Sequence, residues 1–251
     1  MKKLILLTND DGILAEGIRA LKQHIGAVWN TVLVAPDREQ SATSHALTLN
    51  RPLRVNRIDP HTISVDGTPT DCVMLSLTGL LDSKPDLVIS GINSGANLGD
   101  DVIYSGTVAG AAEAAVLGVP SISASLAYPE ETDVEWCARE LVNIAATVFE
   151  NRMPRGVFLN VNFPRKWTGG CHEITILGNR SYREVTVEKI DPRGKPYYWI
   201  GGQVEKWEGA ENCDFAAIER GNISITPLHL DMSASHVVEE IGSWNFSRGN
   251  G

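Results

Sequence analysis

The chain has 251 residues, of which 43% are hydrophobic and 21% are charged, and its formal net charge at pH 7 is −9. This length is sufficient for one large domain with a substantial core, with or without a smaller appendage. The negative charge argues against nucleic acid or an anionic membrane as a partner. An anionic substrate would therefore need local attraction from a metal ion, helix N-termini or a few cationic side chains.

The cysteine pattern and the apolar runs indicate a cytoplasmic protein. The four cysteines are scattered and form no C-x-x-C pair, which argues against a zinc knuckle or a redox motif and is typical of a reduced compartment. The apolar run after Lys2-Lys3 is too short for a signal peptide. The run from Val108 to Val119 contains a glutamate and is too short to cross a bilayer.

Residues 1–164 alternate between short apolar runs and amphipathic or small-residue segments. The apolar runs predict strands at Lys3–Leu7, Thr31–Ala35, Leu53–Val55, Thr62–Val65, Asp86–Ser90, Val119–Ala124 and Val157–Val161. The segments between them predict helices at Leu14–Ile25, Cys72–Leu81 (capped by Asp71 or Thr70), Thr107–Leu117 and Asp133–Phe149. This alternation predicts an α/β fold, with a mostly parallel sheet and helices on both faces. The third and fourth strands fit a hairpin at its edge.

After Pro164 the pattern changes to short strands separated by turn residues. The predicted elements are strands at Ile174–Leu177, Glu184–Glu188 and Tyr197–Ile200, a helix at Cys213–Glu219, a strand at Asn222–Thr226 and a helix at Val237–Trp244. We expect residues 165–251 to form a projecting β arm, a strand that returns to the main sheet and a terminal helix. This segment is not expected to be an independent domain.

Two adjacent carboxylates follow the first predicted strand, in the sequence Asn9-Asp10-Asp11-Gly12. Ligands of open α/β sheets bind at the carboxyl ends of the strands. Neighbouring carboxylates there are unfavourable unless a positive charge lies between them, and Gly12 permits the turn that would let Asp10 and Asp11 share one partner. One interpretation is a divalent cation, and the alternative is an Asx-turn and helix cap before Ile13.

Three further polar loops follow predicted strands and are expected to lie beside the first. In residues 35–43, Ser41 offers a hydroxyl ligand and Arg38 a cation for phosphate. The fifth strand leads into Gly91–Gly99, whose backbone amides and Asn side chains suit a metal or an oxyanion. Tyr104–Thr107 opens a helix whose free N–H groups could bind an anion. Each loop alone could also be an ordinary surface loop or a helix cap.

Together, the four loops predict metal-assisted hydrolysis of a phosphate ester. Carboxylate, hydroxyl and amide oxygens without a thiolate or histidine cluster suit Mg²⁺ or Mn²⁺ better than Zn²⁺. Donors at Asn97, Ser105 and Thr107 could hold the remaining phosphate oxygens. Because no Ser-His or Cys-His nucleophile pair stands out, we favour direct attack by metal-activated water. An aspartyl-phosphate route through Asp10 or Asp11 stays open.

Taken in order, these loops resemble those of the SurE family, the stationary-phase survival protein with 5′/3′-nucleotidase activity. The matching segments are residues 8–12, 34–37, 41–43, 67–73, 90–99, 105–111 and 223–228. The resemblance covers nearly the whole chain. The ordered set is far more specific than any single motif within it.

The resemblance implies a Rossmann-like, three-layer α/β/α fold and a function in hydrolysing nucleoside 5′- and 3′-monophosphates. It implies one divalent metal per subunit, Mg²⁺ or Mn²⁺, whose ligands are Asp10, Asp11, Ser41 and Asn93. Three of these, Asp10, Asp11 and Asn93, are expected to be catalytic. The expected substrate and phosphate contacts are Asn9, Ser41, Asn97, Ser105, Gly106 and Thr107. Activity on short polyphosphate chains is also suggested.

The family further implies homodimers or homotetramers in which C-terminal segments are exchanged between subunits. This agrees with the predicted arm, whose Tyr197-Tyr198-Trp199 would otherwise form an exposed aromatic patch or a local mini-core. The tail departs from the pattern of many members, because Ser235 stands where they carry a histidine, so His229 and His236 receive no catalytic role. A regulatory nucleotide-binding module without turnover is the rival interpretation, and it would not need both carboxylates.

Overall fold

A nine-stranded sheet runs through the described part of the molecule. The computed structural model describes residues 2–165 and 170–244, without the side chains of residues 180–185 and 201–207. The strands of the sheet are β1 (Leu4–Thr8), β2 (Asn30–Pro36), β3 (Val55–Asp59), β4 (Thr62–Val65), β5 (Leu87–Asn93), β6 (Ser121–Leu126), β7 (Val157–Phe163), β8 (His172–Ile174) and β11 (Ile223–His229). The helices are α1 (Glu16–Val28), α2 (Pro69–Leu75), α3 (Gly106–Val116), α4 (Val134–Glu150), α5 (Asp214–Glu219) and α6 (Val238–Gly242).

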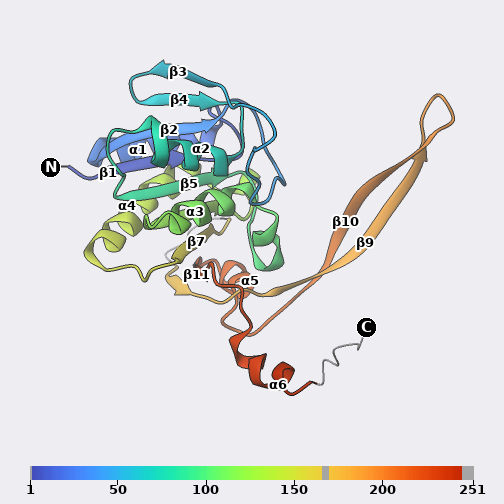
Figure 1. The fold of residues 1–251 in the computed structure, drawn as a ribbon. Coiled ribbons are helices and arrows are strands. Elements are labelled where there is room, and N and C mark those ends of the chain that lie inside the picture. The colour runs from blue at the N-terminus through green and yellow to red at the C-terminus, as the bar shows by residue number, and fades with distance from the viewer. Residues whose placement is uncertain (1, 166–169, 245–251) are drawn as a thin grey trace, which may run out of the picture.

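The centre of the sheet is parallel, in the order β4-β2-β1-β5-β6-β7 (Figure 1). From β1 the chain builds toward β2 and β4, and it later returns to β5 on the other side of β1. The strand order therefore reverses between β1 and β5, where open α/β sheets bind ligands. The hairpin of β3 and β4 closes one edge, and β11 (antiparallel to β7) and β8 extend the other. The predicted Rossmann-like sheet, its edge hairpin and its returning strand are confirmed.

Helices cover both faces of this sheet. α1 and α4 share one apolar core with the sheet, and α2 and α3 share a second core on the opposite face. Successive side chains of β1 alternate between the two cores, because Ile5 and Leu7 belong to the first and Leu6 to the second. This two-sided burial is the reason that the first strand is apolar at successive positions.

The small residues of α3 allow this helix to lie close to the sheet. A Cβ atom on Gly110 would lie 2.8 Å from the Ser90 hydroxyl, and one on Gly106 would lie 2.9 Å from the Asp10 Cβ. Both distances are shorter than real Cβ contacts. The N-terminus of α3 therefore reaches the end of β1 only because glycine occupies these two positions.

The second helix begins earlier than predicted and has a different cap. Thr68 is the N-cap of α2, because its side chain accepts the Asp71 N–H while Asp71 accepts the Thr68 N–H, and Pro69 occupies the first turn. The predicted caps Asp71 and Thr70 are therefore wrong. The helix also ends earlier, and a π-helical turn over Ser76–Leu80 follows it.

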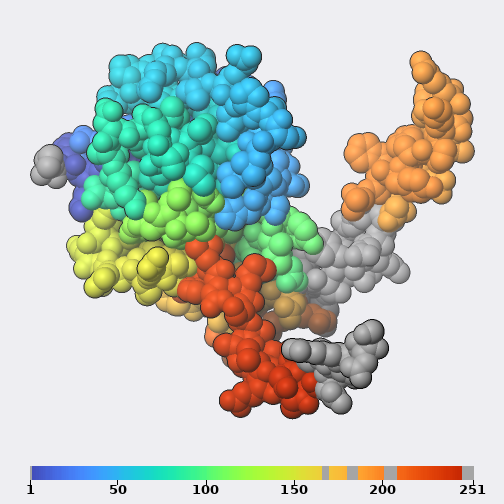
Figure 2. All heavy atoms as spheres, viewed as in Figure 1, coloured from blue at the N-terminus to red at the C-terminus, as the bar shows by residue number. Residues whose placement is uncertain are grey.

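The predicted arm is one long hairpin of β9 (Asn179–Ile190) and β10 (Pro196–Glu208), where we had expected two short strands. The Asp191 carboxylate orders its turn by accepting the N–H groups of Arg193 and Lys195, each at 2.8 Å. The hairpin extends away from the sheet (Figure 1), and Figure 2 shows its outer end standing apart from the rest of the chain. Residues 166–169 and 245–251 of the predicted C-terminal segment lie outside the described residues.

In the part of the chain that the structure describes, no helix is both long enough and apolar enough to cross a lipid bilayer.

The close packing of α1 against β5 can be tested by a substitution at Gly17. A Cβ atom on Gly17 would lie 2.9 Å from the Ile92 carbonyl carbon and closer still to its oxygen. We expect Gly17→Ala to lower the free energy of unfolding by about 1–3 kcal/mol, because the backbone of β5 must shift. The matched control is Gly26→Ala in the same helix, whose Cβ would meet only the Thr31 hydroxyl at 3.3 Å. Urea denaturation measures both, and equal effects of the two substitutions would contradict this packing.

Candidate metal and phosphate site

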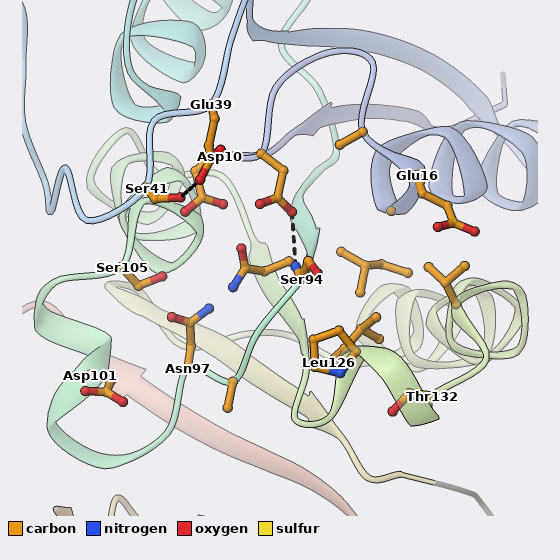
Figure 3. Close-up of a pocket in the computed structure, with 18 of the residues that line it drawn as sticks. Asp10, Glu16, Glu39, Ser41, Ser94, Asn97, Asp101, Ser105, Leu126 and Thr132 are labelled. Atoms are coloured by element: carbon orange, nitrogen blue, oxygen red, sulfur yellow. Dashed lines mark hydrogen bonds between the residues drawn. The ribbon is translucent and has the colours of Figure 1, made fainter. Parts of the chain in front are cut away.

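A cleft of about 970 Å³ opens at the carboxyl ends of β1 and β5. It brings together predicted site residues from four separate loops. The ones that line it are Asp10, Asp11, Ser41, Asn93, Asn97 and Ser105. Figure 3 shows Asp10, Ser41, Asn97 and Ser105 around the same hollow. The cleft therefore lies at the point where the strand order reverses.

Asp10 is the most buried carboxylate of the cleft. It is 5% exposed, and it accepts hydrogen bonds from the hydroxyl and the backbone N–H of Thr107 in the first turn of α3. Burial raises the pKa of Asp10 to about 6, although the Thr107 bonds oppose this shift and the neighbouring Asp11 charge adds to it. Asp10 is thus fixed in place but is unfavourable as an anion in the absence of a positive partner.

Asp11 follows Asp10 in the turn after β1 and also lines the cleft. Its Oδ2 accepts the Ser94 N–H at 3.0 Å, which joins the loop after β1 to the loop after β5. Burial raises the pKa of Asp11, and the Glu39 charge adds to this effect. Among the described residues, neither Asp10 nor Asp11 forms an ion pair with a basic side chain. The pair therefore favours a cation in the cleft.

Asn93 and Ser41 add neutral oxygens to this pair. The Asn93 Nδ2 donates to the Gly95 carbonyl at 2.8 Å, so its Oδ1 is the atom left to bind a cation. Ser41 is exposed, and its hydroxyl donates to Glu39 Oε1 at 2.6 Å. The loop that carries Ser41 is attached beside α3, because the Ser44 N–H donates to the Tyr104 carbonyl at 3.0 Å.

This donor set fits a hard divalent cation. Two carboxylates, a hydroxyl and an amide carbonyl supply oxygen only, as Mg²⁺ and Mn²⁺ prefer. Among residues 2–165 and 170–244, no three His, Cys, Asp or Glu side chains are grouped so that they could hold a metal ion. A site of the nitrogen- and sulfur-rich zinc type is therefore not found in that part of the chain.

The opposite wall of the cleft offers donors suited to a phosphate. Ser105 is the N-cap of α3, and its Oγ accepts the Val108 N–H at 3.0 Å, which leaves its own hydroxyl hydrogen available. Gly106 is the first residue of the helix, where backbone N–H groups have no partner within the helix. An anion placed there also benefits from the helix dipole.

Asn97 is held in this wall by buried amides that the sequence analysis did not single out. Its Nδ2 donates to the Ser125 hydroxyl at 2.7 Å. Its backbone carbonyl accepts hydrogen bonds from the side-chain amides of Asn160 at 2.8 Å and Asn162 at 3.0 Å. Both asparagines are fully buried in β7. Their spacing of two places them on one face of an otherwise apolar strand. This pattern is the feature of the sequence from which their role could have been predicted.

Four of the residues singled out from the sequence do not line the cleft in this structure. Asn9 is fully buried and donates to the Gly12 carbonyl at 2.9 Å, so it closes the turn after β1. Thr107 is also fully buried, and its hydroxyl donates to Asp10. Neither side chain lines the cleft in this structure, where Thr107 instead holds the Asp10 carboxylate and Asn9 closes the turn that contains Asp10. Arg38 and Gly106 likewise do not line the cleft, although Gly106 directly follows Ser105, which does.

Comparison with known proteins identifies the family to which this chain is similar. The model of the family "Survival protein SurE" matches residues 5–184. The 5′-nucleotidase SurE of Geotalea daltonii is 47% identical over 243 residues, which are 96% of this chain and 98% of that protein. The protein of the same name from Citrifermentans bemidjiense is 48% identical over 243 residues, with the same 96% and 98% coverage.

One solved structure is also similar over nearly the whole chain. The crystal structure of SurE protein from Aquifex aeolicus superimposes with a TM-score of 0.85 at 42% identity, and the match covers 95% of this chain and 98% of that one. Both the family model and relatives above 40% identity therefore extend across the four loops that form the cleft. The chain belongs to the SurE family.

Proposed function

We propose that this chain, a 5′-nucleotidase of the SurE family, hydrolyses nucleoside 5′- and 3′-monophosphates with one Mg²⁺ or Mn²⁺ ion bound at the cleft. The proposed metal ligands are Asp10, Asp11, Ser41 and Asn93. The observation that carries this proposal is the pair of adjacent, partly or fully buried carboxylates without a basic partner, opposite the N-terminus of α3.

One set of residues would position the metal ligands, and a second set would orient the phosphate. A bound divalent cation would supply Lewis acidity toward a phosphoryl oxygen and lower the pKa of a water molecule. Thr107 holds the Asp10 carboxylate in one orientation, and Ser94 does the same for Asp11. The Ser105 hydroxyl, the Gly106 N–H and the Asn97 amide would orient the phosphate. We propose direct attack by water on phosphorus, with no covalent intermediate.

The remaining part of the cleft suits the nucleoside. Its lining includes the apolar side chains of Ile92, Leu126, Pro129 and Val134. In Figure 3, Leu126 and Thr132 lie on the side away from Asp101 and Ser105. A volume of about 970 Å³ is large enough for a nucleotide. We also propose a broad substrate range that includes 3′-nucleotides and short polyphosphate chains.

The function is tested by measuring phosphate release from 5′-AMP, 5′-GMP and 3′-AMP with metal-stripped protein. We expect release only after Mg²⁺ or Mn²⁺ is added back, and a loss of at least about 100-fold in Asp10→Asn. The control is Asp82→Asn, because Asp82 is exposed and does not line the cleft. Tight nucleotide binding without release under any divalent ion would instead favour the rival binding module.

The buried Asp10 also predicts how stability depends on pH in the metal-free protein. Its pKa is about 6 in the folded chain against an ordinary value of 3.8, so the folded state holds the proton more tightly. The stability that this proton contributes is present below about pH 4 and is lost as the pH rises through 6. Since one pKa unit corresponds to 1.36 kcal/mol, the ionised carboxylate destabilises the fold by about 3 kcal/mol above pH 7.

We therefore expect metal-free Asp10→Asn to be more stable than the metal-free natural chain at pH 8, by about 1–3 kcal/mol, and equally stable near pH 4. The Oδ1 atom of the amide can still accept the Thr107 hydroxyl, and the amide carries no charge. Added Mn²⁺ is expected to stabilise the natural chain and not the variant. Thermal melting at both pH values checks this, and a variant that is less stable at pH 8 would contradict the burial argument.

We also propose that the chain forms homodimers or homotetramers through exchanged C-terminal segments. The support is the exposed apolar stretch near the tip of the arm, where Tyr198 is 58%, Trp199 61% and Ile200 96% exposed. An isolated two-stranded hairpin is marginally stable in water, and contiguous exposed apolar side chains mark contact surfaces. We further propose a cytoplasmic location, because all four cysteines are free.

The arm proposal predicts a change in mass. Replacing Tyr198, Trp199 and Ile200 together by serine is expected to lower the mass in solution from that of the oligomer toward one 27.2 kDa chain. The matched control is Leu49→Ser, because Leu49 is 87% exposed but lies on the body of the molecule. Light scattering measures both. An unchanged oligomer in the triple variant would contradict the role of the arm.

A further inference from the structure

We propose that Asp214 is a positioning residue that couples the root of the β9–β10 arm to the loop that carries Asn97. The inference rests on the phosphate role proposed above for Asn97. Asp214 lies in α5, after the arm in the sequence, and does not line the cleft. It would act on the reaction only through the backbone that it holds.

One fully buried carboxylate joins three segments. The Asp214 Oδ2 accepts the Gly99 N–H at 2.7 Å, and its Oδ1 accepts the N–H groups of Gly178 at 2.9 Å and Phe215 at 3.0 Å. Gly99 follows Asn97 by two residues, and Gly178 immediately precedes β9. The arm root and the substrate loop are therefore hydrogen-bonded to the two oxygens of the same side chain.

The packing around this carboxylate leaves little space for independent movement. A Cβ atom on Gly99 would lie 2.6 Å from the Gly178 carbonyl oxygen and 3.0 Å from the Phe215 ring. A Cβ atom on Gly178 would lie 2.5 Å from the same ring. The loop, the arm root and the first turn of α5 are thus in direct contact, and a shift of one segment displaces the others.

A small apolar cluster also holds the loop that carries Asn97 against α5. Leu98 is buried together with Cys213, Phe215 and Ile218, which all come from α5 or the residue before it. On its other side Asn97 is held by the asparagines of β7. The position of Asn97 therefore depends on two supports, the sheet and α5, and only α5 is connected to the arm.

Asp214 holds the phosphate end of the loop after β5, at Gly99, whereas Asn93 and Ser94 lie at the end of this loop that faces the metal ligands. The ligands proposed for the metal come from the loops after β1, β2 and β5, and none of them contacts Asp214. A displaced arm would move Gly99 and then Asn97 while the carboxylate pair stays in place. Engagement of the arm by another subunit would thus change the affinity for the substrate without changing the affinity for the metal.

The test is Asp214→Asn in the full chain. An asparagine Oδ1 can still accept the N–H groups of Gly178 and Phe215, but its Nδ2 is a donor and cannot accept from Gly99. We expect the KM for 5′-AMP to rise about 10-fold, with kcat and the Mn²⁺ concentration for half-activation changed less than about twofold. Hydrogen exchange at the Gly99 amide is expected to become faster.

Two controls separate this inference from the proposed function. Asp86→Asn alters a carboxylate that also accepts a backbone N–H, that of Leu4 at 2.9 Å, but at the opposite end of β1 from the cleft, and is expected to change neither KM nor Gly99 exchange. Asn97→Ala tests the phosphate role alone. A KM unaffected by Asn97→Ala would contradict that role, whereas a raised KM in Asn97→Ala but not in Asp214→Asn would overturn the coupling.

A purely structural role for Asp214 would also be detected. If Asp214→Asn lowers kcat, metal activation and thermal stability together, the positioning role is overturned. If this variant does not fold, Gly178→Ala perturbs the arm root from the other side and leaves the carboxylate intact. Gly178→Ala is then expected to raise KM and to accelerate Gly99 exchange, and an unchanged KM would overturn the proposal.

Discussion

The rest of the structure depends on the placement of two adjacent carboxylates where the strand order of a parallel sheet reverses. Asp10 is nearly inaccessible to water, and among the described residues no basic side chain forms an ion pair with it. A fold that keeps such a pair must hold it rigidly and must supply a positive partner from outside. Thr107, Asn9 and the close approach at Gly106 provide the first requirement. A bound cation, we propose, provides the second.

Support for the site is divided among distant parts of the chain. The metal side is fixed by short contacts among the loops after β1, β2 and β5 and the start of α3. The phosphate side depends on Asn97, which is held by β7 and, through Gly99, by α5 beyond the arm. The C-terminal segment therefore does more than extend the sheet. It connects the root of the projecting β9–β10 arm, through Asp214, to the loop of Asn97 that is expected to bind the substrate phosphate.

The sequence predicted the sheet and the gathering of the loops well, because continuous apolar runs and strand-exit glycines depend on local chemistry. It did not predict which side chains face the cleft. Asn9 and Thr107 belong to the matching motifs, yet both side chains are fully buried and do not line the cleft, because a motif does not show which way a side chain points. Leu14 fits the apolar stripe expected for α1 but lies exposed in the turn before it. The Asp214 contacts could not be predicted from the sequence, because they join residues that are far apart in the chain through backbone N–H groups.

The most direct test of the central claim is the heat of Mn²⁺ binding to metal-stripped protein at pH 6, measured in two buffers with different ionisation enthalpies. The account predicts one ion per chain and the release of about half a proton or more, since Asp10 with a pKa of about 6 must ionise to bind it. Asp10→Asn should lose both the binding and the proton release. Binding of equal strength in this variant, or binding without proton release, would contradict the account.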